Sequence, residues 1–284
     1  MPDFAANLST MFAELPLPER FAAAARHGFD AVELTSIADA PPPEIARALH
    51  DNHLTLVACS LPLGSAADAV ACDPERWPQF RDAARRGIDE VAALGSRFVL
   101  CRAAMPAGAS QDRAECALIE NLRFAAEIAM SAGMRLLLEA VDTQSLPGAY
   151  PHCTLQAVRI LEAVRARGLA LCYDVWHMRT MGEPVGETIA RHLPRIGHIQ
   201  IAGSPGRGEP VNGDIDFDRL LEWIDQIGHH GWVGCEYHPA SNTSAGLDWL
   251  ARHRRLTRVR HPVWSIPRPA LEETSLRCCI TDAC

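Results

Sequence analysis

Eight short apolar runs of strand length recur along the chain, and segments with helical periodicity separate them. The runs are continuous rather than alternating, which is typical of parallel strands that are buried on both faces. We therefore predict strands over residues 3–7, 31–34, 54–60, 97–102, 135–140, 170–174, 196–202 and 232–237.

The clearest helical patterns lie between these strands, over residues 18–27, 81–94, 115–132 and 154–167. Asp216 is expected to cap a further helix, whose apolar face begins at Phe217. A glycine falls between a helix and the next strand at five joins, where a left-handed residue is favoured: Gly28, Gly95, Gly133, Gly168 and Gly231.

Eight alternating units predict an α/β protein with a closed (β/α)8 barrel, the TIM barrel, as a single domain. No G-x-G-x-x-G motif follows the first strand, which disfavours a doubly wound dinucleotide-binding fold. The chain has 284 residues, and such a barrel needs about 250. We assign residues 1–258 to the barrel. Residues 259–284 contain prolines and no clear period, so we expect a C-terminal tail that is disordered or loosely docked.

Charge and composition exclude several classes of function. A net charge of −8 argues against nucleic acid as the main partner. The basic cluster at residues 252–260 is interpreted as the solvated end of the last helix. No apolar run reaches the length of a membrane span, and the first residues do not resemble a signal peptide. The ten cysteines lack zinc or redox spacing, which favours a reduced, cytoplasmic compartment.

Four of the later strands end on a residue suited to metal binding or acid–base chemistry: Glu139, Asp174, Gln200 and Glu236. The carboxyl ends of barrel strands surround one mouth, so these side chains should converge. Three carboxylates and an amide form an all-oxygen site that suits a divalent metal, Mg2+ or Mn2+.

Glu139 and Glu236 are the outer members of this set and are the candidate catalytic residues. One carboxylate would remove a proton next to a carbonyl group and the other would return one to the neighbouring carbon. This chemistry is an isomerisation or an epimerisation, and it needs no organic cofactor.

Further candidates at the same mouth are substrate-binding residues. His177 follows Asp174 by three residues, although a structural histidine is an equal alternative. Arg207 is placed to hold a substrate carboxylate, with a surface arginine as the alternative, and Arg102 and Asn7 end strands of their own. Glu33 either joins the site or forms a buried ion pair with an arginine. His238 is a weaker candidate.

Several long blocks resemble hydroxypyruvate isomerases and their relatives, the 2-oxo-tetronate isomerases: FAANLSTMF, RFAAAARHGFDAVEL, DVWHM, RHLPRIGHIQIAGSPGR and HGWVGCEY. The resemblance covers roughly residues 1–252 and implies a xylose-isomerase-like TIM barrel acting on a small-molecule substrate. It also implies that Glu139 and Glu236 exchange the proton and that Glu139, Asp174, Gln200 and Glu236 hold the metal. The implied reaction converts hydroxypyruvate to 2-hydroxy-3-oxopropanoate (tartronate semialdehyde) through an enediolate.

The chain departs from the family pattern at positions that face the substrate. Family members read E-P-I-N after the fifth strand, where this chain has Glu139 to Asp142, and Ser60 stands in place of Asn. Arg102 interrupts the usual fourth-strand run, and His238 replaces a common Lys or Arg, a loss that Arg102 would have to compensate. The metal set is intact, so the departures bear on the substrate rather than on the chemistry.

Two alternatives therefore stay open: a sugar epimerase or ketose isomerase on the same metal site, and a catalytically silent paralogue that binds a metabolite. A hydrolase resembling endonuclease IV is disfavoured, because it would need more histidines and a basic face. Barrels of this kind often form a homo-oligomer, but no pattern in this sequence fixes an interface.

Overall fold

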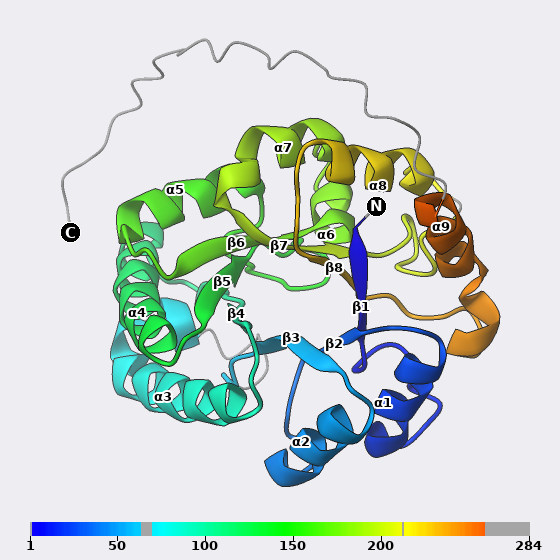
Figure 1. Ribbon diagram of the computed structural model, residues 1–284. Helices are drawn as coiled ribbons and strands as arrows, with labels where there is room; N and C mark the ends of the chain where they lie inside the picture. The colour runs from blue at the N-terminus through cyan, green and yellow to red at the C-terminus, as the bar shows by residue number, and fades with distance from the viewer. Residues whose placement is uncertain (1, 64–69, 212, 259–284) are drawn as a thin grey trace.

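Eight parallel strands close into a barrel in the computed structural model, which confirms the predicted fold class (Figure 1). The structure describes residues 2–63, 70–211 and 213–258, with the backbone alone for 254–258; the predicted tail lies outside this part of the chain. Each strand pairs with the next, and β8 pairs with β1. The strands are β1 (Asp3–Asn7), β2 (Ala31–Leu34), β3 (Thr55–Ser60), β4 (Phe98–Cys101), β5 (Arg135–Glu139), β6 (Leu169–Asp174), β7 (Ile196–Ile201) and β8 (Trp232–Cys235).

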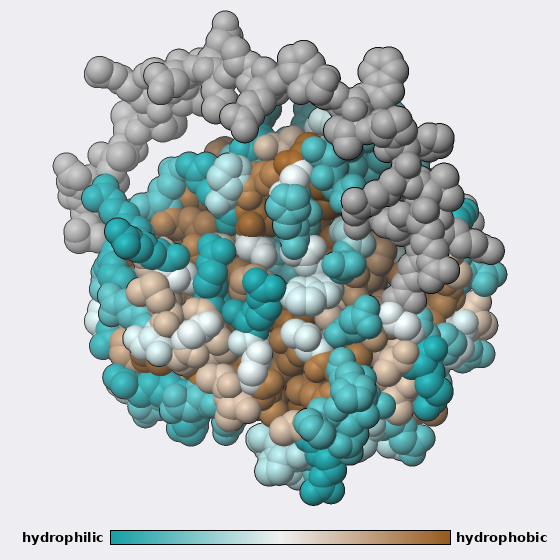
Figure 2. Space-filling model, in the orientation of Figure 1, coloured by the Kyte–Doolittle hydropathy of each residue, from teal (hydrophilic) through white to brown (hydrophobic). Residues whose placement is uncertain are grey.

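Helices form a ring outside the strands. They are α1 (Leu17–Arg26), α2 (Pro42–Asp51), α3 (Trp77–Ala93), α4 (Gln111–Ser131), α5 (Thr154–Val164), α6 (Val175–Thr180), α7 (Val185–His192), α8 (Phe217–Gln226) and α9 (Asp248–Arg258). The 3-10 turns η2 (Val70–Cys72), η3 (Pro74–Arg76), η4 (Leu193–Arg195) and η5 (Thr243–Gly246) lie in the connections. Hydrophilic residues dominate the outer helices in Figure 2, with apolar residues visible between them. Among the described helices, none has the length and apolar character to cross a bilayer.

Residues of several strands are divided between two different cores. In β5, Leu136 and Leu138 pack against the surrounding helices, whereas Leu137 faces a small cluster inside the barrel. The inner cluster consists largely of small residues: Ala5, Ala31, Val57, Ala58, Leu100, Leu137, Ala170 and Cys172. Because side chains alternate along a strand, the residue two positions beyond an inner one also points inward. Glu139, two positions after Leu137, therefore points inward at the end of β5, toward the mouth of the barrel.

At the joins between helices and strands, two of the five glycines predicted to be left-handed are not. Gly28, Gly95 and Gly133 have positive φ as expected, but Gly168 and Gly231 do not. After α5, Arg165 takes the left-handed conformation with φ 54°, and Gly228 takes it after α8 with φ 87°. Gly168 is small for a different reason, since a Cβ there would lie 2.8 Å from the carbonyl oxygen of Ala126 in α4.

Candidate active site

The four residues predicted from the strand ends lie at one mouth of the barrel. Glu139 and Asp174 end β5 and β6, Gln200 lies in β7 and Glu236 directly follows β8. Asp174 and Gln200 are partners in the register between β6 and β7. All four side chains are buried, and Glu139, Gln200 and Glu236 line one small cavity. The structure therefore gathers all four residues in one place.

A cluster of possible metal ligands forms around Glu139. Its Oε1 lies 3.7 Å from Nε2 of His177, and that nitrogen lies 3.7 Å from Oδ2 of Asp174. One ligand atom from each of these three residues falls within 4.8 Å of the others. Oε1 of Glu139 and Oδ2 of Asp174 are both buried without a hydrogen-bond partner in the described part of the chain. Unpaired buried oxygens are costly, so this donor set fits a hard divalent cation.

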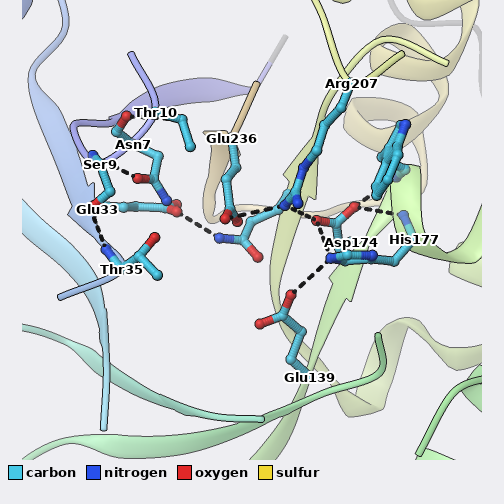
Figure 3. Close-up of polar contacts among 12 residues, drawn as sticks. Asn7, Ser9, Thr10, Glu33, Thr35, Glu139, Asp174, His177, Arg207 and Glu236 are labelled. Atoms are coloured by element: carbon cyan, nitrogen blue, oxygen red, sulfur yellow. Dashed lines mark hydrogen bonds and ion pairs between the residues drawn. The ribbon is translucent and has the colours of Figure 1, made fainter. Parts of the chain in front are cut away.

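The two carboxylate oxygens of Asp174 have different surroundings: one contacts backbone N–H groups and the other faces the mouth of the barrel. Oδ1 accepts hydrogen bonds from the backbone N–H groups of Trp176 (2.7 Å) and His177 (3.0 Å), which caps α6. Oδ2 faces the cluster. The strand-to-helix turn thus fixes the carboxylate and also places His177 beside it (Figure 3).

Asp142 contacts the His177 ring through the nitrogen that does not face Glu139 and Asp174. This contact was not predicted from the sequence. Nδ1 of His177 lies 2.6 Å from Oδ2 of Asp142, and the other Asp142 oxygen accepts from the backbone N–H groups of Gln144 and Ser145. Burial alone raises the pKa of Asp142, but Ser145 and His177 together hold it below its ordinary value. Asp142 stands where the family pattern has Asn, and that departure was the available signal.

Arg207 reaches the mouth from the loop that follows β7. Its Nη2 lies 3.2 Å from Glu236 and 3.6 Å from Asp174, and its guanidinium carbon lies 4.9 Å from the centre of the Trp176 ring. The residue has φ 55°, an uncommon conformation for a non-glycine residue. The loop folds back so tightly that a Cβ on Gly203 would lie 2.3 Å from the Glu209 carbonyl oxygen.

Arg102 and Asn7 also line the small cavity. Nε of Arg102 lies 3.9 Å from Oε2 of Glu139, and the side chain is 30% exposed. The side-chain oxygen of Asn7 accepts a hydrogen bond from the backbone N–H of Ser9, which stabilises the turn after β1. His238 lies beside the site through its backbone N–H, which donates to the Arg207 carbonyl oxygen.

Glu33 contacts the site and two residues of β7. One oxygen accepts from Nε2 of Gln200 at 2.8 Å, and the other lies against Nε2 of His198. The alternative of a buried ion pair with an arginine is wrong, because histidine and glutamine take that place. His198 was not foreseen either, although it precedes Gln200 by two residues and therefore shares its face.

The two outer glutamates have raised pKa values. Burial, and next the neighbouring Glu139, raise the pKa of Glu236 to about 8, although Arg207 opposes this shift. Burial also raises the pKa of Glu139, against the opposing effects of Arg102 and His177. Without a bound cation, this pair therefore favours keeping a proton near neutral pH.

Comparison with known proteins gives the family. The family model described as "Xylose isomerase-like TIM barrel" matches residues 21–253 of this chain. The chain belongs to this family. A hydroxypyruvate isomerase of Escherichia coli (strain K12) is 37% identical over 255 residues, covering 88% of this chain and 99% of the relative. A 2-oxo-tetronate isomerase of Cupriavidus necator is 36% identical over 254 residues, covering 88% and 98%. These two relatives confirm the expectation that the chain is an isomerase.

Solved structures agree on the fold. A structure named as an AP endonuclease, family 2, from Brucella melitensis has a TM-score of 0.86 and 34% identity, covering 89% of this chain and 99% of that one. An apo 3-keto-D-glucoside 4-epimerase from E. coli has a TM-score of 0.75 at 20% identity, covering 90% and 99%. At that identity the second likeness supports the barrel fold alone.

Proposed function

We propose that this protein interconverts hydroxypyruvate and 2-hydroxy-3-oxopropanoate (tartronate semialdehyde) through an enediolate. The observation that carries the proposal is the pair of buried carboxylates, Glu139 and Glu236, which approach the centre of the mouth from opposite sides in Figure 3. The names of the relatives, a hydroxypyruvate isomerase and a 2-oxo-tetronate isomerase, support a short oxo acid as the substrate.

The reaction moves one proton between two adjacent carbons. One of the two glutamates, as the carboxylate, takes a proton from the hydroxyl-bearing C3 of hydroxypyruvate, next to the C2 carbonyl. The other, as the acid, delivers a proton to C2, and the hydroxyl proton passes from the C3 oxygen to the C2 oxygen. In the metal-free protein, burial raises the pKa of both glutamates, to about 8 for Glu236. The shift is toward the neutral range, where proton transfer by a carboxyl group is efficient.

We propose that Glu139, Asp174, Gln200 and Glu236 hold a divalent metal, Mg2+ or Mn2+, with His177 as a neighbouring donor. When bound, such a cation stabilises negative charge on a substrate oxygen. His177, fixed by Asp142, and Arg207, fixed by its loop and by Trp176, are then placed to bind and orient the substrate.

Charge balance favours an acid over a neutral sugar. The guanidinium groups of Arg102 and Arg207 lie beside the three carboxylates of Glu139, Asp174 and Glu236. With one divalent cation, the positive charges number four. They face three ionised carboxylates, namely Asp174, the buried Glu33 of the same cavity and whichever of Glu139 and Glu236 does not hold the proton, so a single positive charge is in excess. A substrate carboxylate would neutralise it, and a neutral sugar would not. Arg102 thus supplies the cation that His238 does not.

The likeness to the Brucella endonuclease structure raises a nuclease as another candidate, but two observations oppose it. The net charge of −8 disfavours binding to a phosphate backbone. In addition, the metal-type cluster found among the described residues contains a single histidine.

The test is proton exchange in D2O. Purified protein with Mg2+ or Mn2+ is incubated with hydroxypyruvate, 2-oxo-tetronates and small neutral ketoses, and deuterium uptake and product are followed by NMR. We expect uptake at the carbon next to the carbonyl, together with product, for hydroxypyruvate. Activity on neutral ketoses alone would favour the epimerase. No exchange with any compound would favour a silent metabolite-binding paralogue.

A further inference from the structure

A buried carboxylate crosses the inside of the barrel from β2 to β7. Glu33 belongs to β2, whereas His198 and Gln200 belong to β7, and β1 and β8 separate these strands in the sheet. Glu33 is 1% exposed, and its two oxygens meet Nε2 of His198 and Nε2 of Gln200. The proposed chemistry gives Glu33 no task, so its burial calls for another explanation.

The barrel has a space that fits this carboxylate. Gly234 of β8 is the register partner of Gln200. A Cβ on Gly234 would lie 2.0 Å from Oε1 of Glu33 and 2.7 Å from its Cδ, which is far inside van der Waals contact. The glycine is therefore required by the close approach of Glu33 and not by its own backbone conformation.

The two ends of the Gln200 amide have different partners, Glu33 at the NH2 group and Cys172 at the oxygen. The oxygen and NH2 ends of an amide are nearly equal in shape, so the surrounding partners decide the orientation. Because the Glu33 carboxylate accepts hydrogen bonds, the NH2 end of the Gln200 amide faces it. The oxygen then lies on the Cys172 side, where the thiol donates to it at 3.1 Å. Cys172 is the register partner of Glu139 and precedes Asp174 by two residues on the same face.

We propose that Glu33 is a positioning residue: by holding the NH2 group of Gln200, it turns the amide oxygen toward Glu139 and Asp174, where a metal ion is expected. The reverse orientation would place the amide oxygen against a carboxylate, which is repulsive. This inference rests on the proposed function, because it takes Gln200 as a metal ligand. Partners that orient a metal ligand typically change metal affinity by about 10- to 100-fold when they are removed.

The experiment measures Mn2+ binding to metal-free, full-length protein by isothermal titration calorimetry, with the unfolding temperature recorded in EDTA. The variants are Glu33→Leu, Glu33→Gln and Gly234→Ala. We expect Glu33→Leu and Gly234→Ala to weaken Mn2+ binding at least about tenfold. Glu33→Gln should weaken it less, because a glutamine oxygen can still accept from Gln200.

Gly197→Ala is the matched control. Gly197 lies in the same strand as Gln200, and a Cβ there would lie 2.7 Å from a Leu137 side-chain carbon and 2.9 Å from the Ala170 Cβ, inside the barrel but away from the site residues. It should lower the unfolding temperature, as is also expected of Gly234→Ala, and leave the Mn2+ affinity unchanged. A purely structural role for Glu33 would change the unfolding temperature alone.

The proposal is overturned if folded Glu33→Leu or Gly234→Ala binds Mn2+ as tightly as the native protein, or if Gly197→Ala weakens binding equally. If Glu33→Leu does not fold, Gly234→Ala decides by the same criterion. A native protein that binds no Mn2+ overturns both the proposed metal site and this inference. Weakened Mn2+ binding in the variants, combined with no isomerase activity in the native protein, rejects the proposed reaction and supports the positioning role.

Discussion

At the scale of single residues, three buried glutamates of the barrel interior differ in what surrounds them. Glu33 receives two side-chain donors, Glu139 faces Arg102 and His177, and Glu236 faces Arg207. Glu139 and Glu236 have raised pKa values, with burial as the main cause. The environment, rather than the residue type, therefore separates a pair suited to proton transfer from a carboxylate suited to holding an amide.

Glu139→Gln and Glu236→Gln should each reduce turnover of hydroxypyruvate by at least about a hundredfold, because an amide can neither accept nor return the proton. Turnover and deuterium exchange measure the effect. Glu120→Gln, on the outer surface of α4, is the control and should keep native activity. A loss below about tenfold in both site variants would contradict the assigned roles.

Arg102→Gln should raise KM for an oxo acid more than it lowers kcat, because it removes a cation from the mouth. A charge-assisted hydrogen bond contributes about 1.5–3 kcal/mol, which corresponds to roughly a ten- to hundredfold change in KM. Steady-state kinetics on hydroxypyruvate test this, with Arg113→Gln as an exposed control whose partner is Glu75. An unchanged KM would show that Arg102 does not contact the substrate carboxylate.

At the scale of elements, the joins between helices and strands position the site. Asp174 ends β6 and caps α6 at once, which brings His177 to the mouth. The predicted cap of α8 is confirmed, since the Asp216 carboxylate accepts from the backbone N–H of Arg219 at 3.1 Å. The left-handed joins were predicted less well. Arg165 takes the left-handed conformation that was assigned to Gly168. Close packing against α4 is instead the reason for the glycine at position 168.

Asp216→Ala should destabilise the protein by about 1 kcal/mol, because α8 loses its N-terminal acceptor. In a chain of this size, the unfolding temperature should fall by about 2–4 °C, as measured by thermal melting. Ser110→Ala is the matched control: Ser110 precedes α4 in the capping position but makes no side-chain cap bond. Equal losses in the two variants would contradict a specific capping role for Asp216.

At the scale of the whole molecule, the barrel concentrates carboxylates where water is excluded. Glu139, Asp174 and Glu236 are all buried at one mouth, and two arginines offset part of their mutual repulsion. Such an arrangement lowers stability in the absence of a cation, and binding of a cation restores it. The outer ring and the inner cluster of small residues supply the rigid frame that tolerates this cost.

The stability of the metal-free protein should therefore depend on pH through Glu236. Its pKa is raised from 4.5 in the unfolded chain to about 8 in the folded protein. The folded state holds the proton longer, so this group's contribution is fully present below pH 4.5 and is lost as pH rises through 8. Thermal melts in EDTA should show falling stability across this window, and Glu236→Gln should remove part of the slope. Saturating Mn2+ should raise the native melting temperature most at the alkaline end. A slope that Glu236→Gln leaves unchanged would exclude this origin.

The sequence by itself determined the barrel and the convergence of Glu139, Asp174, Gln200 and Glu236. Both follow from local patterns, because continuous apolar runs specify parallel strands and the two-residue period specifies which side chains face inward. Only the tertiary structure decided the partners: Asp142 behind His177, Arg102 beside Glu139, and Glu33 holding Gln200 across the space beside Gly234. Those contacts join residues from strands and loops far apart in the chain. They depend on side-chain reach and packing across the barrel, which no local pattern encodes.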